Sequence, residues 1–196
     1  MTKAPNKTVQ PELFGSTEPE GFRYQPGLIG ECEEAELLAE LSRLDFQPFD
    51  FNGHLANRQV VNYGLRYDYG AQRVVESEPL PPWLASLRRK VAEFAGRAAE
   101  DFVQVLINEY RIGAGVGWHR DRPQFGEVVG VSLLSRCPFR FRRQDGARWI
   151  RRTVELEPRS AYLLSGPARH VWQHAITPVE SHRYSITFRT LVKPRG

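Results

Sequence analysis

The sequence predicts an α+β protein, in which an N-terminal part with helices and a loop or hairpin precedes a β-sandwich or jelly roll. Before residue 100, two stretches repeat apolar residues at the helical period. From Phe102 onward, seven short apolar-rich runs follow one another in fewer than 100 residues, separated by Gly, Pro and Asp. Closely spaced short strands of this kind are typical of a sandwich or jelly roll.

Two helices and a variable segment are expected in the N-terminal half. A helix is predicted over 33–44, where leucines recur at the helical period and acidic residues occupy the first turn. The pair Pro81-Pro82 predicts the start of a second helix, extending to about residue 99, because proline suits the first helical turn. Between them, residues 50–70 mix aromatic, basic, Asn and Gly residues without a sustained period. We expect a loop or hairpin there, and a substrate lid is one use for it.

The C-terminal half supplies the predicted sheets. Strands are expected at 102–110, 127–134, 138–143, 149–156, 160–165, 171–176 and 183–192. No repeat or linker divides the chain, so we expect a single domain over 21–196. Within it, about 21–100 would form the helical and lid part, and about 101–193 the jelly-roll core.

The first 20 residues are rich in Pro, Thr, Glu and Lys, and we expect them to form a flexible arm. Within this arm, Gln10-Pro-Glu-Leu-Phe14 resembles the short Gln-x-x-Leu-Phe peptides that bind bacterial sliding clamps. The resemblance implies a sliding clamp as a partner. In the alternative interpretation, Leu13 and Phe14 attach the arm to the domain.

The composition describes an ordinary globular chain. Its 196 residues are 41% hydrophobic and 26% charged, which fits one domain with a substantial core. No apolar run approaches the roughly 20 residues of a membrane helix, and the first residues lack the apolar core of a secretory signal. Two cysteines, Cys32 and Cys137, are too few for a disulfide framework and agree with a reducing compartment. We therefore expect a cytoplasmic monomer without a membrane segment.

The charge balance permits a polyanionic partner. The formal net charge is +4 and the sequence pI is about 9.3, which is compatible with nucleic-acid binding without requiring it. Arginines alternate with aromatic residues over 140–143 and 148–152, a pattern that could hold phosphates and stack on bases. An exposed strand edge protected by charge is an equally good interpretation.

One set of residues indicates a metal site. His119 and Asp121 are separated by one residue, so on a strand or extended loop both side chains point the same way, and Trp118 faces away. His174 would arrive from a distant strand. Two histidines and one carboxylate form the ligand set of non-haem Fe(II) oxygenases, which leaves metal positions open for cosubstrate and oxygen.

A zinc hydrolase site is the alternative use of these residues. His170 and His174 would lie on one face if their segment were helical, and Asp121 could complete a zinc site. The apolar residues around His174 favour a strand instead. This interpretation also leaves the arginines of the last strand unexplained.

The last predicted strand indicates an anion site. It places Arg183, Ser185, Thr187 and Arg189 on one face, and Tyr184, Ile186 and Phe188 on the other. The polar face could simply lie in water. Alternatively it lines a cavity, where buried arginines would require anionic partners. A guanidinium fork matches carboxylate geometry, so the strand and the metal set together indicate an iron enzyme that consumes 2-oxoglutarate.

Two further polar residues fit that interpretation. Asn108 and Tyr110 share a face of the strand at 102–110, and both side chains can hydrogen-bond a carboxylate or keto acid. Polar residues at a strand end would be the ordinary explanation. The order along the chain favours function, because Asn-x-Tyr is followed by His-x-Asp, a further His and two arginines six positions apart.

These stretches resemble the AlkB-type Fe(II)/2-oxoglutarate dioxygenases. The likeness is strongest over about 102–192 and rests on Ile107-Asn-Glu-Tyr-Arg111, Gly117-Trp-His-Arg-Asp-Arg122, Val131-Ser-Leu-Leu134, Arg169-His-Val-Trp-Gln-His174 and Arg183-Tyr-Ser-Ile-Thr-Phe-Arg189. The resemblance implies a double-stranded β-helix, with the N-terminal half supplying helices packed on one sheet and a nucleotide-recognition lid. It also implies that His119, Asp121 and His174 bind iron, with His170 as a neighbour.

The resemblance further implies a cosubstrate pocket. Arg183, helped by Tyr110, would bind the far carboxylate of 2-oxoglutarate, and Asn108 and Arg189 would complete the pocket. Ser185 is a departure, because bacterial AlkB has an asparagine there. A second departure is Arg122-Pro123, where the DNA-repair members carry an acidic residue that helps to read the damaged base.

The activity implied is oxidative dealkylation of N-alkylated bases in DNA or RNA, such as 1-methyladenine and 3-methylcytosine. It would use Fe(II), 2-oxoglutarate and O2 and release formaldehyde, succinate and CO2, with no side chain acting as a general base. The residues predicted to stack on the base or to form lid contacts are Arg58, Tyr63, Tyr67 and Trp118.

Two alternative functions remain open at this point. The loss of the acidic base-reading position suggests the same dioxygenase chemistry on a protein side chain or small molecule. The basic pI and the Gln10–Phe14 segment suggest a non-enzymatic module that binds nucleic acid or a sliding clamp. Retention of all three expected ligands and of both arginines argues against the second alternative.

Overall fold

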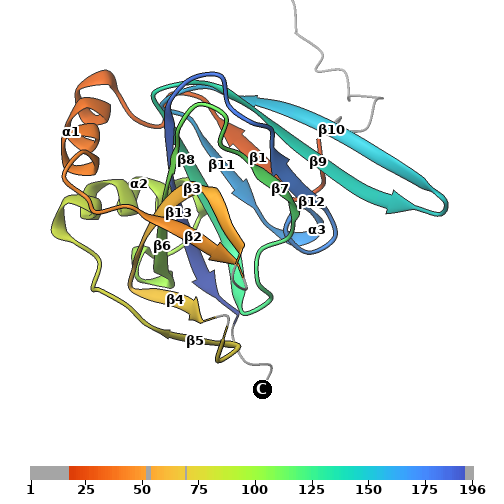
Figure 1. Cartoon of the computed structure of the whole chain (residues 1–196), viewed down its shortest axis with the longest axis horizontal. Helices are drawn as coiled ribbons and strands as arrows, with labels where there is room; N and C mark the ends of the chain where they lie inside the picture. Colours follow the sequence, from red (N-terminus) through yellow and green to blue (C-terminus); the bar gives the residue numbers. More distant parts are fainter. Residues whose placement is uncertain (1–17, 52–53, 69, 193–196) are drawn as a thin grey trace, which may run out of the picture.

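Two antiparallel sheets form a jelly roll, with two helices packed on one side of the larger sheet (Figure 1). The computed structural model describes residues 18–51, 54–68 and 70–192. The proposed clamp-binding segment, Gln10–Phe14, and most of the predicted arm lie outside these residues. The predicted α+β jelly roll is confirmed.

The larger sheet has seven strands and the smaller has four. In spatial order, the larger sheet contains β1 (Phe22–Gln25), β11 (Ala161–Leu164), β8 (Phe125–Leu133), β13 (Arg183–Leu191), β6 (Phe102–Tyr110), β3 (His54–Tyr63) and β2 (Gln47–Phe51). The smaller sheet contains β10 (Arg148–Leu156), β9 (Cys137–Asp145), β12 (Gln173–Ile176) and β7 (Val116–His119). A separate hairpin pairs β4 (Leu65–Asp68) with β5 (Arg73–Glu76).

The helices are short and lie near the larger sheet. They are α1 (Glu31–Leu41), α2 (Ala85–Ala95) and α3 (Gly166–His170), with single turns of 3-10 helix at Pro82–Leu84 and Ala99–Asp101. Acidic residues fill the first turn of α1, where they complement the helix dipole. The second helix ends at Gly96, whose φ of 70° lies in the left-handed region that glycine adopts without strain. No helix of the described residues is long and apolar enough to span a bilayer.

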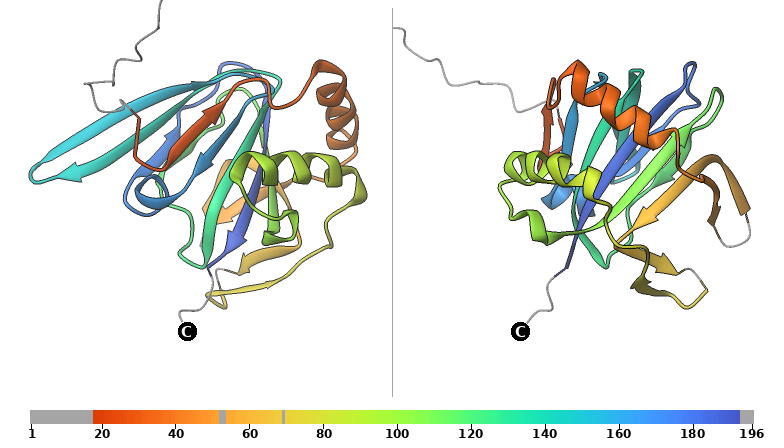
Figure 2. Two further views of the ribbon diagram at one scale, coloured as in Figure 1. Left: turned by 180° about the vertical axis from the view of Figure 1, so that it is seen from behind. Right: turned by 90° about the vertical axis from the view of Figure 1, so that its left-hand side faces the viewer.

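Two apolar cores lie on opposite sides of the larger sheet. The outer core packs α1 and α2 against the sheet, through residues such as Leu37, Leu87 and Val91 (Figure 2). The inner core lies between the two sheets and contains Phe139 and Phe141 of β9 among other buried aromatic residues. Strands β6, β8 and β11 contribute residues to both cores, because alternate residues of a strand point to opposite faces of the sheet.

This arrangement decides which face of β13 is buried inside the jelly roll. Ile186 and Phe188 belong to the outer core beneath the helices. Arg183 and Ser185, at alternate positions, therefore point toward the smaller sheet, and both are buried. The polar face of the last strand lines the interior rather than lying in water.

Several segments differ from the sequence predictions. The segment 171–176 is not one strand, because a helical turn with Pro167 in its first turn extends to His170 and β12 begins only at Gln173. The segment 50–70 contains much more regular structure than a loop, since β3 joins the larger sheet by pairing with β6. Strands β1, β2, β5 and β7 are additional to the predicted strands, and each has only four or five residues.

Candidate metal and cosubstrate centre

The topology brings the three predicted metal ligands together. Strands β7 and β12 are neighbours, and His119 lies directly opposite His174 in their register. Asp121 follows two residues after His119 and reaches the same point. One ligand atom from each residue lies within 4.8 Å of the others, and the two imidazole centroids are 4.3 Å apart. His170 is exposed at the end of α3 and is not part of this cluster, so the structure does not bring together the predicted zinc set.

The protonation states suit a metal ion. Burial lowers the pKa of His174 to about 3, and burial also lowers the pKa of His119, so both imidazoles are neutral near pH 7. Nδ1 of His119 lies 2.9 Å from the carbonyl oxygen of Gly117, which fixes a tautomer that leaves Nε2 with a free lone pair. Neutral imidazoles and an ionised carboxylate are the forms that bind divalent metals.

Asp121 is kept ionised by its surroundings. Burial raises the pKa of Asp121, but the Arg189 guanidinium and the two histidines more than offset this and hold it well below its usual range. Arg189 donates hydrogen bonds to Asp121 and, from Nη1, to Oε1 of Gln104 at 2.8 Å. Arg189 therefore contacts the carboxylate of the triad directly, and its predicted place in the cosubstrate pocket stays a prediction.

A fully buried guanidinium lies on the inward-facing side of β13. Arg183 has 0% exposure, and its Nη2 donates to Oγ of Ser132 at 2.9 Å. Its Cζ lies 4.9 Å from the ring centroid of Tyr110. Its remaining nitrogens, Nε and Nη1, have no hydrogen-bond partner among the described residues. Such a group is costly to bury alone, so its environment fits a carboxylate ligand.

Asn108 and Ser185 extend the same polar wall. They face each other in the register of β6 and β13, and Nδ2 of Asn108 lies 3.3 Å from Oγ of Ser185. Oδ1 of Asn108 is buried without a partner in the described chain. Unpaired donors on Arg183 and a His–Asp–His cluster are the groups that a 2-oxo dicarboxylate needs at its two ends. The residues present therefore fit both Fe(II) and 2-oxoglutarate.

Arg169 shapes the segment that carries Asp121 of the triad. Its guanidinium donates to four backbone carbonyls, those of Asp121 (3.3 Å), Arg122 (2.7 Å), Phe125 (2.7 Å) and Gly126 (2.8 Å). The residue is buried, and it comes from α3, far along the chain. Sequence reasoning gave Arg169 no role, because its partners are backbone atoms that leave no pattern of residue types.

The four predicted substrate residues divide into two groups. Arg58 lies close enough to His119 to help lower its pKa, and Tyr67 stacks beneath Arg122, next to the metal aspartate. Tyr63 is part of the packing of the outer core. Trp118 contacts arginines on the side of the smaller sheet that faces away from the triad.

The fold and the site define an iron-dependent oxygenase, and comparison with known proteins identifies its family. A family model of the 2OG-Fe(II) oxygenase superfamily matches residues 21–189, and the chain therefore belongs to this superfamily. The solved structure of OsALKBH1 matches with a TM-score of 0.65 at 16% identity, over 88% of this chain and 97% of that one. This likeness supports the jelly-roll fold.

Two relatives whose names contain ALKBH8 are similar to this chain over most of its length. The Arabidopsis thaliana protein named "Alkylated DNA repair protein ALKBH8 homolog" is 29% identical over 180 residues, covering 80% of this chain and 50% of the plant protein. The Xenopus tropicalis "tRNA (carboxymethyluridine(34)-5-O)-methyltransferase alkbh8" is 32% identical over 166 residues, covering 78% of this chain and 25% of the frog protein. The chain thus spans about half of the first relative and a quarter of the second.

Within the superfamily the chain is similar to AlkB-type proteins, in agreement with the resemblance of its motifs. It is an Fe(II)/2-oxoglutarate-dependent dioxygenase that uses Fe(II), 2-oxoglutarate and O2.

Proposed function

We propose that the enzyme oxidatively removes alkyl groups from N-alkylated bases of DNA or RNA, with 1-methyladenine and 3-methylcytosine as the first substrates to test. The names of the relatives support a nucleic-acid substrate, since one refers to alkylated DNA repair and the other to tRNA. We propose further that His119, Asp121 and His174 hold the iron, and that Arg183 with Tyr110 and Asn108 holds 2-oxoglutarate.

The observation that carries the nucleic-acid proposal is a pair of arginine–aromatic stacks on the triad's side. Cζ of Arg122 lies 4.7 Å from the ring centroid of Tyr67, and Cζ of Arg58 lies 4.1 Å from that of Phe49. The first stack joins the β4–β5 hairpin to the segment after Asp121. Flat cationic and aromatic groups beside a metal site suit a flipped base and its flanking phosphates.

The side chains of this protein position the metal ligand Asp121 and neutralise the charge of the cosubstrate carboxylate. Held by His119, Asp121 and His174, Fe(II) would supply oxidising chemistry that consumes 2-oxoglutarate and O2, releases an N-methyl group as formaldehyde and yields succinate and CO2. Arg183 neutralises a carboxylate in a site closed to water, and Arg189 keeps Asp121 ionised and fixed. No side chain in this arrangement is required to act as a general base.

The test uses purified protein, Fe(II), 2-oxoglutarate, ascorbate and single-stranded oligonucleotides carrying 1-methyladenine or 3-methylcytosine, as DNA and as RNA. Mass spectrometry follows the oligonucleotide and succinate together. We expect loss of one methyl mass for each succinate, and neither product from His119→Ala. Formation of succinate without demethylation would refute nucleic-acid dealkylation, and the protein would remain a dioxygenase with a different substrate.

A different substrate for the same chemistry is the second candidate. Arg122 and Pro123 stand where the resemblance implies an acidic base-reading residue, and the Arg122 guanidinium lies on Tyr67 instead. A protein side chain or small molecule would then be oxidised. Methylated nucleosides, peptides and oligonucleotides compared in the same succinate assay would separate the two candidates.

A further inference from the structure

We propose that the outer face of the four-stranded sheet binds the single-stranded nucleic acid that flanks the target base. The inference rests on the proposed function, because it concerns the same substrate strand. The outer face is defined here as the side chains of Trp118 on β7, Arg140 and Arg142 on β9, and Trp149 and Arg151 on β10.

Strand alternation separates this face from the metal triad. Phe139 and Phe141 of β9 are buried in the inner core, and the ring centroid of Phe139 lies 5.3 Å from that of His174. Arg140 and Arg142, at the alternate positions, therefore point to the other side of the sheet. The outer face is a second surface and not part of the metal centre.

The outer face carries an ordered stack of flat side chains. Cζ of Arg142 lies 4.5 Å from the ring centroid of Trp118 and 4.5 Å from that of Trp149. Nε of Arg142 donates to Oε1 of Gln173 at 2.7 Å, which fixes the guanidinium between the two indoles. Trp149 remains 41% exposed, so part of its ring surface faces solvent. Exposed aromatic rings held among arginines are a platform on which bases stack.

The charge of the molecule is concentrated in the same hairpin. Residues 137–156 hold six arginines, no lysine and two acidic residues. The whole chain has 27 basic and 23 acidic residues, so the rest of it has 21 of each and no net charge. None of the six arginines forms a salt bridge with a described residue. A polyanion is the partner whose charge complements this surface.

The register places like charges face to face. Arg142 and Arg151 are direct partners across β9 and β10, an arrangement that destabilises a strand pair. A bound phosphate would offset this repulsion, because it supplies the missing counter-charge. Binding of the nucleic-acid backbone beside Arg142 and Arg151 is thus favoured, because these two positive charges repel each other in the free protein.

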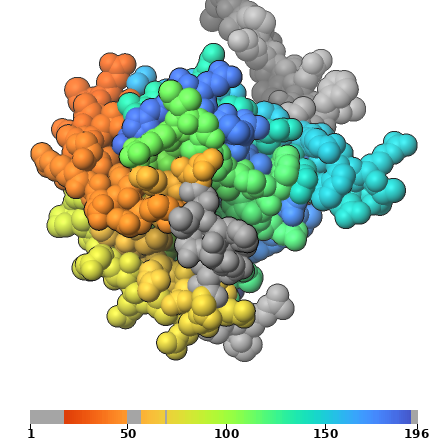
Figure 3. All heavy atoms as spheres, viewed as in Figure 1, coloured from red at the N-terminus to blue at the C-terminus, as the bar shows by residue number. Residues whose placement is uncertain are grey.

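Protection of a sheet edge does not account for the whole pattern. Strand β10 is the edge of the smaller sheet, so its arginines could discourage pairing with other chains. Arg140 and Arg142, however, lie on β9, which is paired on both sides. The hairpin also projects from the body of the molecule as a long arm (Figures 1 and 3), which enlarges the surface that a strand can contact.

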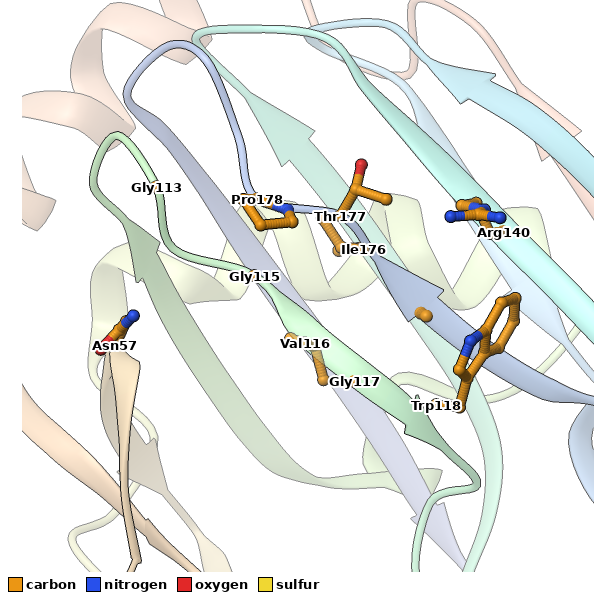
Figure 4. Close-up of a pocket in the computed structure, with 11 residues that line it drawn as sticks. Asn57, Gly113, Gly115, Val116, Gly117, Trp118, Arg140, Ile176, Thr177 and Pro178 are labelled. Carbon is orange, nitrogen blue, oxygen red and sulfur yellow. The ribbon is translucent and has the colours of Figure 1, made fainter.

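A groove leads from the outer face to the edge of the sheet. A hollow of about 500 Å³ lies beside Trp118 and Arg140, with Gly115 and Gly117 of the β7 segment in its lining and Asn57 at its other end (Figure 4). Strand β7 forms the edge of the smaller sheet opposite to β10, and its consecutive residues Trp118 and His119 face opposite sides of the sheet. A single-stranded nucleic acid that lies in the groove can pass over this edge of the sheet and place a flipped base at the triad.

Two matched double variants test the proposal. Arg142→Gln/Arg151→Gln removes two charges from the outer face. Arg143→Gln/Arg152→Gln removes two charges from the opposite face of the same hairpin, because Arg152 pairs with the buried Phe141. Arg151→Gln alone is the fallback variant, since Arg151 is exposed and its removal leaves the Arg142 stack in place.

Binding is measured by fluorescence anisotropy with a labelled single-stranded oligonucleotide containing 1-methyladenine, in the presence of Fe(II) and 2-oxoglutarate and the absence of oxygen. We expect the outer-face pair to weaken binding roughly tenfold and to reduce the salt dependence of log Kd by about 1.4, or about 0.7 per lost phosphate contact. Arg151→Gln should reduce the salt dependence by about half as much, or about 0.7, because it loses one phosphate contact. The control pair should bind within about twofold of the wild type, because its charges face away from the strand.

Equal weakening by both pairs would show that only net charge matters and would overturn the assignment of the outer face. Unchanged binding by the outer-face pair would overturn it as well. Failure of the proposed function looks different: the wild type would bind through the outer face and yet remove no methyl group when oxygen is admitted. Binding and demethylation are therefore read separately in one sample.

Discussion

Arg189 holds one oxygen of Asp121 and leaves the other oxygen facing His174. Nε and Nη2 of Arg189 lie 2.9 and 2.7 Å from Oδ1 of Asp121. Oδ2 of the same carboxylate lies 3.6 Å from Nε2 of His174. The arginine thus fixes the rotation of the carboxylate, and the oxygen it leaves uncontacted is the one directed into the cluster of ligand atoms. Partners of this kind orient a metal ligand and set its affinity.

The first prediction concerns this contact. Arg189→Met should lower Fe(II) affinity by about 10–100-fold, because the carboxylate loses its anchor and its pKa rises. Arg189→Lys should recover part of the loss. Metal titration in the absence of oxygen measures the affinity, and the KM for 2-oxoglutarate is measured beside it. Unchanged metal affinity with a raised KM would instead make Arg189 a cosubstrate contact.

The second prediction concerns Arg183, whose two unpartnered nitrogens are buried. Arg183→Met should raise the KM for 2-oxoglutarate by at least about 100-fold, since charge-assisted hydrogen bonds contribute about 1.5–3 kcal/mol each. The free protein should be no less stable, because the variant removes a buried charge that lacks an anionic partner. Initial rates of succinate formation measure the KM, and thermal unfolding measures the stability of the free protein. A wild-type KM would exclude Arg183 from the cosubstrate site.

The third prediction concerns the four carbonyls held by Arg169. Lysine has three donors and no planar fork, so Arg169→Lys should loosen residues 121–126. We expect faster proteolysis in this segment, a lower thermal midpoint and weaker Fe(II) binding. Arg120→Lys is the matched control, because Arg120 is exposed and donates one hydrogen bond, to the carbonyl of Val171 at 3.2 Å. Equal effects of the two variants would contradict the positioning role.

The fourth prediction is a pH dependence of the metal-free protein. Burial lowers the pKa of His174 to about 3, whereas a histidine in the unfolded chain has a pKa of about 6.5. Below pH 6.5 the unfolded chain therefore binds more protons, and stability should fall as the pH falls toward 3. Between pH 7 and pH 5 the loss from this residue should be about 2 kcal/mol. Urea unfolding at both pH values should show a smaller loss for His174→Gln, and an equal loss would refute the cause.

The ligand set of the candidate site could be predicted from the sequence, because its signals are local. His119 and Asp121 are separated by one residue and so share a direction, and Arg183 to Arg189 alternate polar and apolar residues along one strand. The fold class followed from the density of short strands. What remained open was whether the polar face of β13 lay in water, and only the packing of α1 and α2 on the other face decided it.

Two of the missed features depend on partners that leave no local pattern. Arg169 binds backbone carbonyls, and Ser132 meets Arg183 across the sheet, so neither is marked by a spacing of residue types. Trp118 faces away from His119 and Asp121, as the alternation of strand residues predicts, and contacts Arg142 on the outer face. The helix at 166–170 was hidden because five residues give little periodicity.

The central claim is that the triad and Arg183 hold Fe(II) and 2-oxoglutarate in one site. The most direct measurement is an anaerobic titration with Fe(II) and then 2-oxoglutarate, followed by visible absorption, because a 2-oxo acid chelated to Fe(II) produces a charge-transfer band. The wild type should develop the band only with both additions, Asp121→Ala should not develop it, and Arg183→Met should require much more 2-oxoglutarate. A band of wild-type intensity and affinity in either variant would contradict the account.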